Sequence, residues 1–345
     1  MNAWRNPGVL AALGAALLFG AGTPAAKLLL GPVSPWLLAG LLYLGSGLGL
    51  AVWRKLRRTE SVRLPRGEIK WLAGAILAGG IAAPVLLMWG LSSMPASGAS
   101  LLLNAEGVFT ALLAWFVFRE NFDRRIAIGM ALIVAGAVVL SWPGDASCGS
   151  ALPAVAVIGA CFFWALDNNL TRKVALADAT FIAMAKGLVA GTANVAIAWT
   201  LGASLPRPEI LLAAGGIGFF SYGVSLVLFV LALRHLGTAR TGAYFSTAPF
   251  AGAFIAIPLL GETVTAALVV AGLLMGAGVW LHLTEHHEHQ HTHELLEHEH
   301  EHVHDEHHRH EHAASVSGPH SHRHRHEPLT HSHPHYPDAH HRHDH

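Results

Sequence analysis

Long apolar stretches constrain this chain more than any other feature of its sequence. Each has about 20 mostly apolar residues, the length that an α-helix needs to cross the hydrocarbon core of a bilayer. Gly, Pro or charged residues separate the stretches. About ten of them predict an all-α membrane protein of about ten transmembrane helices. They lie near residues 8–30, 34–53, 70–92, 96–118, 125–142, 152–171, 178–201, 210–233, 238–260 and 264–283.

The composition excludes a water-soluble globular protein. Hydrophobic residues make up 52% of the chain and charged residues only 13%, which does not suit a surface in contact with water. The two cysteines, Cys148 and Cys161, provide no disulfide framework. The N-terminus lacks the basic segment and cleavage pattern of a removable signal, so we expect the first apolar stretch to be kept as a span.

Basic residues gather in alternate connections between the stretches. The N-terminus and the even connections together carry fifteen Lys and Arg, whereas the odd connections carry only Arg207. Because basic residues are retained on the cytoplasmic side during insertion, we expect a multi-pass protein of the plasma (inner) membrane with both termini cytoplasmic.

The two halves of the apolar region repeat at a nearly fixed offset. A shift of 142 places Glu120 on Glu262 and Gly136 on Gly278. Chance similarity between Gly- and Ala-rich helices is the alternative interpretation. Five spans per half is an odd number, so the halves would insert with opposite topology, as in many secondary transporters that bind substrate near the midplane between repeats. The predicted domains are residues 1–142, residues 143–284 and a tail of residues 285–345.

A Glu-containing turn precedes the last apolar stretch of each half, at Arg119-Glu120 and at Gly261-Glu262. Gly-rich stretches follow both turns, and the sequence WALDNNLTRK lies at 164–173. With these features, residues 8–283 resemble the EamA branch of the drug/metabolite transporter superfamily, from which Arg119 departs where Gly is usual. The resemblance implies secondary transport or exchange of small molecules, often export, without ATP, and it implies no particular substrate.

Four ionisable residues fall inside predicted spans, where an unpaired charge is costly and often functional. Glu106 and Lys186 lie well inside and are candidates for substrate binding or proton coupling. The alternative is a structural pair between Glu106 and either Lys186 or Lys27. Asp167 and Lys27 lie nearer the span ends, so we expect their side chains to snorkel to the membrane interface.

Uncharged polar and aromatic side chains add candidates for a midplane cavity, although ordinary packing is the alternative for each. This wider group includes Asn169, Ser246 and Trp89. Pro24, Pro84, Pro249 and Pro258 could break helices near a ligand. No catalytic or ATP-binding motif is found, so we do not expect an enzyme. The predicted substrate-binding set is Glu106, Lys186, Asn104, Asp167, Asn168, Trp164, Tyr222 and Tyr244.

The C-terminal tail is rich in histidine, with 24 in its 61 residues, largely alternating as His-x-His. Few apolar residues are present, so we expect the tail to be disordered. Imidazole suits Zn, Ni, Co and Cu(II), so the tail is predicted to bind a divalent transition metal, whereas the fold needs no cofactor. A solvated tail without a role and a purification tag are the alternatives, and the dispersal of the histidines argues against a tag. The predicted ligands are His298, His300, His302, His304, His307, His308, His310, His312, His320, His322, His324 and His326.

Charge also divides at the start of the tail. Residues 1–284 hold 18 basic and 10 acidic residues, and the tail holds 4 and 12. The acidic tail could therefore lie against the basic connection between Arg54 and Lys70, and protonation or metal loading would release it.

These features favour a secondary active transporter that exports a small solute, with a metal-binding tail that regulates transport or delivers cargo. One alternative is an exporter of an organic metabolite or drug whose tail only buffers metal. Another is a membrane anchor for a metal store that transports nothing. The expected partners are a small-molecule or metal cargo, the lipid bilayer and a second copy in a homodimer, but no nucleic acid. The predicted spans contain no His cluster or Cys pair, which argues against a bare metal ion as cargo.

Overall fold

The computed structural model has two units, a helical unit and a smaller unit within residues 286–336. Placement is described for residues 7–59, 64–118, 124–141, 151–172, 174, 178–236, 241, 244–283, 288–293, 296–302, 320–326 and 329–334. The turn at Arg119-Glu120 and Cys148 lie outside these residues.

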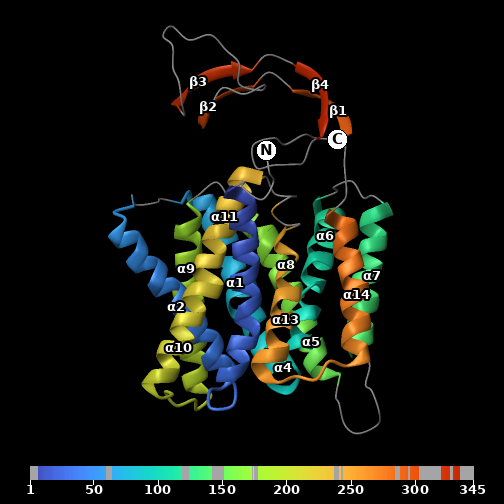
Figure 1. Cartoon of the computed structure of the whole chain (residues 1–345). Coiled ribbons are helices and arrows are strands. Elements are labelled where there is room, and N and C mark those ends of the chain that lie inside the picture. The colour runs from blue at the N-terminus through green and yellow to red at the C-terminus, as the bar shows by residue number, and fades with distance from the viewer. Residues whose placement is uncertain are drawn as a thin grey trace. The chain divides into compact units, whose positions relative to one another are not determined.

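The helical unit begins with long helices joined by short connections (Figure 1). Its first elements are α1 (Pro7–Leu29), α2 (Pro35–Leu56), α3 (Arg66–Ala75), η2 (Ile76–Ala82), α4 (Ala83–Ser93), α5 (Ala96–Leu102), α6 (Ala105–Phe118) and α7 (Arg124–Ser141). The elements that follow are α8 (Leu152–Arg172), α9 (Ala179–Thr200), α10 (Pro208–Gly218), η3 (Phe219–Val224), α11 (Ser225–Leu236), α13 (Ala248–Leu260) and α14 (Ala266–Leu283).

Six continuous helical segments of the described chain are long and apolar enough to cross a membrane, and three more are apolar but shorter. The prediction of a helical membrane protein is confirmed. One predicted span, residues 96–118, is interrupted because α5 ends at Leu102 and α6 begins at Ala105. Asn104 lies in this break, and its Nδ2 donates to the carbonyl oxygen of Leu101 at 2.9 Å.

Two helical runs widen into π-helix in their middle, at η2 and at η3. In η2 the sequence explains the change, because Pro84 follows within the first turn of α4 and has no backbone N–H to donate to the carbonyl of Gly80. No proline follows η3 in α11, and we have no comparable local reason for that segment.

Glycines allow the long helices to approach closely. α2 packs against α9, and a Cβ added at Gly47 or at Gly187 would lie 2.5 Å from a backbone nitrogen of the facing helix. α7 packs along α14 (Figure 1), where Gly136 and Gly278 each face the other helix. Small residues at such crossings allow the dispersion contacts and close backbone approach that hold membrane helices together.

The described part of the tail contains two short strand pairs, and the disorder of the tail stays a prediction. β1 (Glu288–His293) pairs with β4 (Leu329–Pro334), and β2 (Leu296–His302) pairs with β3 (His320–His326), both antiparallel. The physical reason is the alternation of His with another residue, because a period of two matches the alternating faces of a strand.

Candidate functional site

An ion pair lies inside the helical unit between α8 and α9. Lys186 Nζ is 2.6 Å from both carboxylate oxygens of Asp167, and the Thr171 hydroxyl donates to Asp167 Oδ1 at 2.8 Å. Thr171 reaches the carboxylate because residues four apart share one face of a helix. Asp167 is only 5% exposed. The expectation that its side chain snorkels is therefore wrong, because a cation on the neighbouring helix satisfies it within the bundle.

The π-helix η2 makes room for this carboxylate. A Cβ added at Gly79 would collide with Oδ2 of Asp167, so only glycine fits there. The carbonyl oxygen of Gly79 accepts hydrogen bonds from the Tyr43 hydroxyl at 2.6 Å and from Trp164 Nε1 at 3.0 Å. Asn194 Nδ2 donates to the next carbonyl, that of Gly80, at 3.0 Å. Side chains of α2, α8 and α9 thus satisfy carbonyls that the widened helix leaves free.

Glu106 lies in the first turn of α6 and faces α8. Its Oε1 accepts a hydrogen bond from Asn168 Nδ2 at 2.7 Å. Asn168 directly follows Asp167, so the two polar groups are neighbours along α8. The alternative, a structural pair of Glu106 with Lys186 or Lys27, is not formed, because Lys186 bonds to Asp167 and Lys27 to backbone carbonyls.

Aromatic side chains from both halves of the sequence meet beside this network. Phe19 contacts Trp164, Tyr222 and Phe245, with ring centroids 6.2, 5.9 and 5.4 Å away. Tyr43 contacts Tyr222 at 5.4 Å. Such tilted and edge contacts suit aromatic rings and also offer faces to a cation. We call Phe19, Tyr43, Trp164, Tyr222 and Phe245 the aromatic cluster.

Sequence reasoning identified Trp164 and Tyr222 but missed the other members of the aromatic cluster and Gly79. A detectable signal existed for Gly79, because two glycines stand four or five residues before Pro84 in an apolar stretch. Phe19 and Tyr43 gave no such signal, since a single aromatic residue in an apolar span is ordinary.

Other predicted residues lie in packing positions. Asn104 is buried and donates to Leu101, and Asn169 donates to the carbonyl of Ala165 one turn earlier on α8 at 2.8 Å. The carbonyl of Tyr244 accepts from the Thr247 hydroxyl at 2.6 Å in the turn before α13. Trp89 is 45% exposed on α4, so its expected place in an internal cavity is wrong.

Lys27 lies near the end of α1 and is partly buried. Its Nζ donates to the carbonyl oxygens of Leu91 at 2.5 Å and Met94 at 3.0 Å. These carbonyls belong to the last turn of α4 and to the residue that ends it, which lack helical donors.

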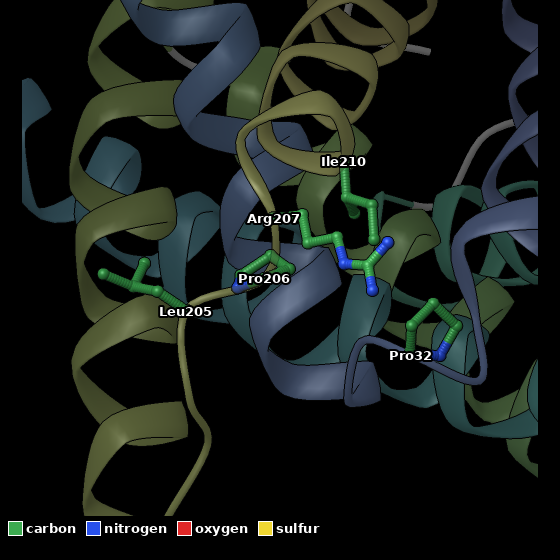
Figure 2. Close-up of a pocket in the computed structure, with 5 residues that line it drawn as sticks. All are labelled: Pro32, Leu205, Pro206, Arg207 and Ile210. Atoms are coloured by element: carbon green, nitrogen blue, oxygen red, sulfur yellow. The ribbon is translucent and has the colours of Figure 1, made fainter.

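A pocket of about 380 Å³ lies where the α1–α2 and α9–α10 connections meet (Figure 2). Figure 2 shows the Arg207 side chain extending from the start of α10 toward Pro32. Leu205, Pro206 and Ile210 complete its lining. The pocket shares no residue with the network around Asp167, so we keep it apart from the candidate site.

A second ion pair joins the end of α2 to the start of α9, where Arg54 Nη1 is 2.5 Å from Asp178 Oδ2. Asp178 also caps α9 by accepting from the backbone N–H groups of Thr180 and Phe181. Partial burial acts to raise the pKa of Asp178, but hydrogen bonds from Thr180, Arg54 and those N–H groups outweigh it and lower the pKa to about 2.

Comparison with known proteins identifies the family and the fold of the helical unit. The EamA-like transporter family model matches residues 6–142 and again residues 151–284. The chain belongs to the EamA-like transporter family. A solved crystal structure has the same fold, with a TM-score of 0.61 and 19% identity over 81% of this chain and 99% of its own.

Relatives of this EamA-like protein are named as transporters. An "uncharacterized transporter" of Methanothermobacter thermautotrophicus is 31% identical over 294 residues, which cover 79% of this chain and 85% of the relative. A "probable terminal-alkyne amino-acid exporter" of Streptantibioticus cattleyicolor is 28% identical, covering 64% and 75%. A "probable amino-acid metabolite efflux pump" of Salmonella typhimurium is 29% identical, covering 55% and 68%. The EamA-like chain is thus a multi-pass membrane transporter of small solutes.

Proposed function

We propose that this EamA-like protein is a secondary active transporter that exports a small organic solute bearing an amino group. The observation that carries the proposal is the environment of Glu106. Its described side-chain partner is the neutral amide of Asn168, while the neighbouring carboxylate of Asp167 already has Lys186. The site therefore holds one carboxylate that a cationic group could neutralise.

Ten spans in two inverted five-helix repeats, residues 1–142 and 143–284, form the frame of this proposal. Two matches to one family model support a duplication, and the π-helices η2 and η3 begin 143 residues apart. Packing supports it further. α1 packs on α11 and α13, and α8 packs on α4 and α6, which are the corresponding pairs if the halves are exchanged. An odd number of spans per half makes the repeat inverted.

The distribution of basic residues supports an orientation with both termini cytoplasmic in the plasma (inner) membrane. In that orientation the connections α1–α2 and α4–α5 face outward. Solute would enter from the cytoplasm and leave past the α4–α5 turn.

The chemistry beside Glu106 suits an ammonium group attached to an apolar or aromatic body. The carboxylate would pair with the ammonium, and the aromatic cluster would contact the rest of the solute through ring faces and edges. Two relatives are named for amino-acid compounds, which supports an amino-bearing cargo. A homodimer remains a prediction.

The carboxylate of Glu106 could also couple solute export to proton entry. A lone carboxylate inside a membrane bundle is strongly disfavoured as a bare anion, so it holds either a proton or a cationic solute. If the two compete for Glu106, inward proton movement drives outward solute movement. No ATP-binding motif is needed.

Exchange in proteoliposomes tests this proposal, with labelled phenylalanine as the first probe of an α-amino-acid panel. We expect Glu106→Gln to abolish pH-driven exchange, because an amide takes up neither a proton nor an ammonium charge. Glu209→Gln is the matched control, since Glu209 is an exposed acid in the first turn of α10. Equal exchange by both variants would refute a role for Glu106.

We propose further that the tail binds divalent Zn, Ni, Co or Cu. The proposal rests on the number of histidines and on their register, in which His298, His300 and His302 stand opposite His324, His322 and His320, although no three described side chains are placed together as a ready metal site. Alternate positions share a strand face, so these six histidines share one face, and Glu299 stands opposite Arg323 on the other. His304, His307, His308, His310 and His312 lie outside the described residues.

Two measurements test the tail. Zinc titration of full-length protein should show several binding equivalents that a chain ending at Thr284 lacks, and equal zinc binding would contradict the proposal. Exchange by the two chains, with and without zinc, separates the possible roles. A zinc effect confined to the full-length chain indicates regulation, whereas zinc movement through both indicates that metal is cargo. If zinc changes exchange by neither the full-length nor the shortened chain, the tail only buffers metal.

A further inference from the structure

The turn between α4 and α5 is held by two charged side chains that come from elsewhere in the chain. Lys27, near the end of α1, donates to the carbonyls of Leu91 and Met94 at 2.5 and 3.0 Å. The two carboxylate oxygens of Glu262 accept from the backbone N–H groups of Ala96 and Ser97 at 2.6 and 2.9 Å. We call Lys27 and Glu262, with the backbone groups they bind, the turn clamp.

Each charge of the turn clamp matches the helix end that it binds. Carbonyls at the end of a helix carry partial negative charge and N–H groups at its start carry partial positive charge, so a lysine and a glutamate are the suitable partners. Hydrogen bonds to ionised groups are also stronger than neutral ones. The clamp thus fixes both sides of a turn of only two residues, Met94 and Pro95.

Backbone geometry determines where Glu262 stands. Gly261 ends α13 in the left-handed region, with φ of 65°, a conformation that glycine adopts at little cost. The N–H of Glu262 donates back to the carbonyl of Ile257 at 3.1 Å. The residue is therefore fixed to the end of α13, and the clamp ties this helix and α1 to the α4–α5 turn.

Close packing of the same helices lies further into the bundle, about one turn along α5 and two to three turns along α1 and α13. A Cβ added at Gly252 of α13 would be 2.7 Å from the carbonyl oxygen of Gly20 on α1 and 2.7 Å from the hydroxyl oxygen of Ser100 on α5. Nothing can pass between α1, α5 and α13 at this level unless the helices separate. The clamp and the glycine contact are independent observations that close the same end.

We propose that Lys27 and Glu262 are positioning residues of a gate at the end of the bundle where α1 terminates. They hold the α4–α5 turn against α1 and α13, and release of solute on that side requires their hydrogen bonds to the turn to break. Polar bonds suit this role because water can replace them when the gate opens, whereas separated apolar faces would be exposed. That solute leaves here rests on the proposed transport function, but the closure itself does not.

Labelling of a buried thiol tests the gate without any solute. In a background of Cys148→Ser and Cys161→Ser, Ser97→Cys places a thiol beside the clamp at a position that is 2% exposed. A membrane-impermeant maleimide is added to sealed vesicles that present this side outward. We expect the double variant Lys27→Met with Glu262→Gln to label about tenfold faster than the background, the factor expected when charge-assisted bonds are lost.

Arg207→Met with Glu209→Gln is the matched control, because it removes one cation and one acid from a connection that does not bind the α4–α5 turn. It should label at the background rate. The conservative pair Lys27→Arg with Glu262→Asp should return the rate toward background, which separates gating from general misfolding. An unchanged rate in the Met/Gln double variant overturns the gate. Faster labelling without any solute exchange would leave the gate standing and refute the proposed transport function instead.

Discussion

The two π-helical segments of the bundle share a backbone form but differ in how they are held. η2 receives side-chain hydrogen bonds on the carbonyls of Gly79 and Gly80, and Asp167 packs on Gly79. In the described part of the chain no side chain donates to a carbonyl of η3. There Ser221 meets Gly22 of α1, where an added Cβ would be 2.8 Å from the serine Cβ.

The two segments share a glycine contact with a neighbouring helix but differ in the charged groups beside that contact. Both segments pack against an α-helix through a glycine, Gly79 of η2 at α8 and Gly22 of α1 at η3. Only the first contact carries charge, because Asp167 packs on Gly79 and is paired with Lys186. Similar glycine packing can therefore occur at both π-helices while the charged groups gather beside only one of them.

The largest expected effect comes from breaking the ion pair of Asp167 and Lys186 beside η2. Asp167→Leu leaves the Lys186 ammonium buried without its carboxylate, and we expect a loss of roughly 3–5 kcal/mol in the free energy of unfolding. Ser221→Ala in η3 should cost under about 1 kcal/mol. Denaturant unfolding in detergent measures both. The double variant Asp167→Leu with Lys186→Met should recover most of the stability, and its failure to do so would show that the loss does not come from an unpaired Lys186.

Glycine substitutions test the two contacts directly. Gly79→Ala forces a methyl group into Asp167, whereas the methyl of Gly22→Ala meets the Ser221 side chain at 2.8 Å. Overpacking of this kind costs about 1–3 kcal/mol, and we expect Gly79→Ala to be at the upper end and Gly22→Ala at the lower. Thermal unfolding ranks them. The reverse order would mean that the surroundings of Gly79 at η2 accommodate an added methyl group more easily than those of Gly22 at η3.

Loss of a hydroxyl donor should matter only at η2. Tyr43→Phe removes a donor to the Gly79 carbonyl and should cost about 1 kcal/mol. Tyr222→Phe is the control, because its hydroxyl has no hydrogen-bond partner among the described residues, and we expect under about 0.5 kcal/mol. Hydrogen exchange at η2 amides should rise in the first variant alone. Equal exchange in both would show that Tyr43 does not hold the segment.

The smallest effect comes from the ion pair at the start of α9, which is more exposed than the pair beside η2. Because the pKa of Asp178 is lowered from 3.8 to about 2 in the folded protein, its contribution is present above pH 4 and is lost as the pH falls from about 4 to 2. Solvent screening keeps the contribution to about 1 kcal/mol or less. Asp178→Asn keeps the helix cap and should flatten the pH dependence of unfolding in that range. A slope equal to that of the unmodified protein would assign the dependence to other acids.

Much of the frame could be predicted from residues 1–284 because membrane spans are specified locally. A run of about 20 apolar residues predicts a crossing without knowledge of its neighbours, and the helices follow those runs closely. The break inside residues 96–118 and the two π-helices were not predicted. Hydropathy shows which residues are apolar. It does not show whether the backbone of a helix has α-helical or π-helical hydrogen bonds.

The candidate site was predicted in its residues but not in its pairs. Glu106, Asp167 and Lys186 were named from their cost in a membrane, and Asn168 as an uncharged polar residue of a cavity. The pairing of Lys186 with Asp167 depends on how α8 and α9 are rotated and offset. Sequence spacing fixes neighbours within one helix and says little about partners across helices. The same limit explains why Asp167 was expected at the interface.

Glu262 shows the difference between what the sequence determines and what the tertiary structure decides. The sequence by itself determined that a glycine and a glutamate end one apolar stretch before the last one begins, and also that the chain crosses a membrane many times and carries a histidine-rich tail. Only the tertiary structure decided that this glutamate binds the backbone of Ala96 and Ser97, 166 and 165 residues away. The reason is physical. Span formation depends on local transfer free energy, whereas the contacts that close a bundle depend on the packing of helices far apart in the chain.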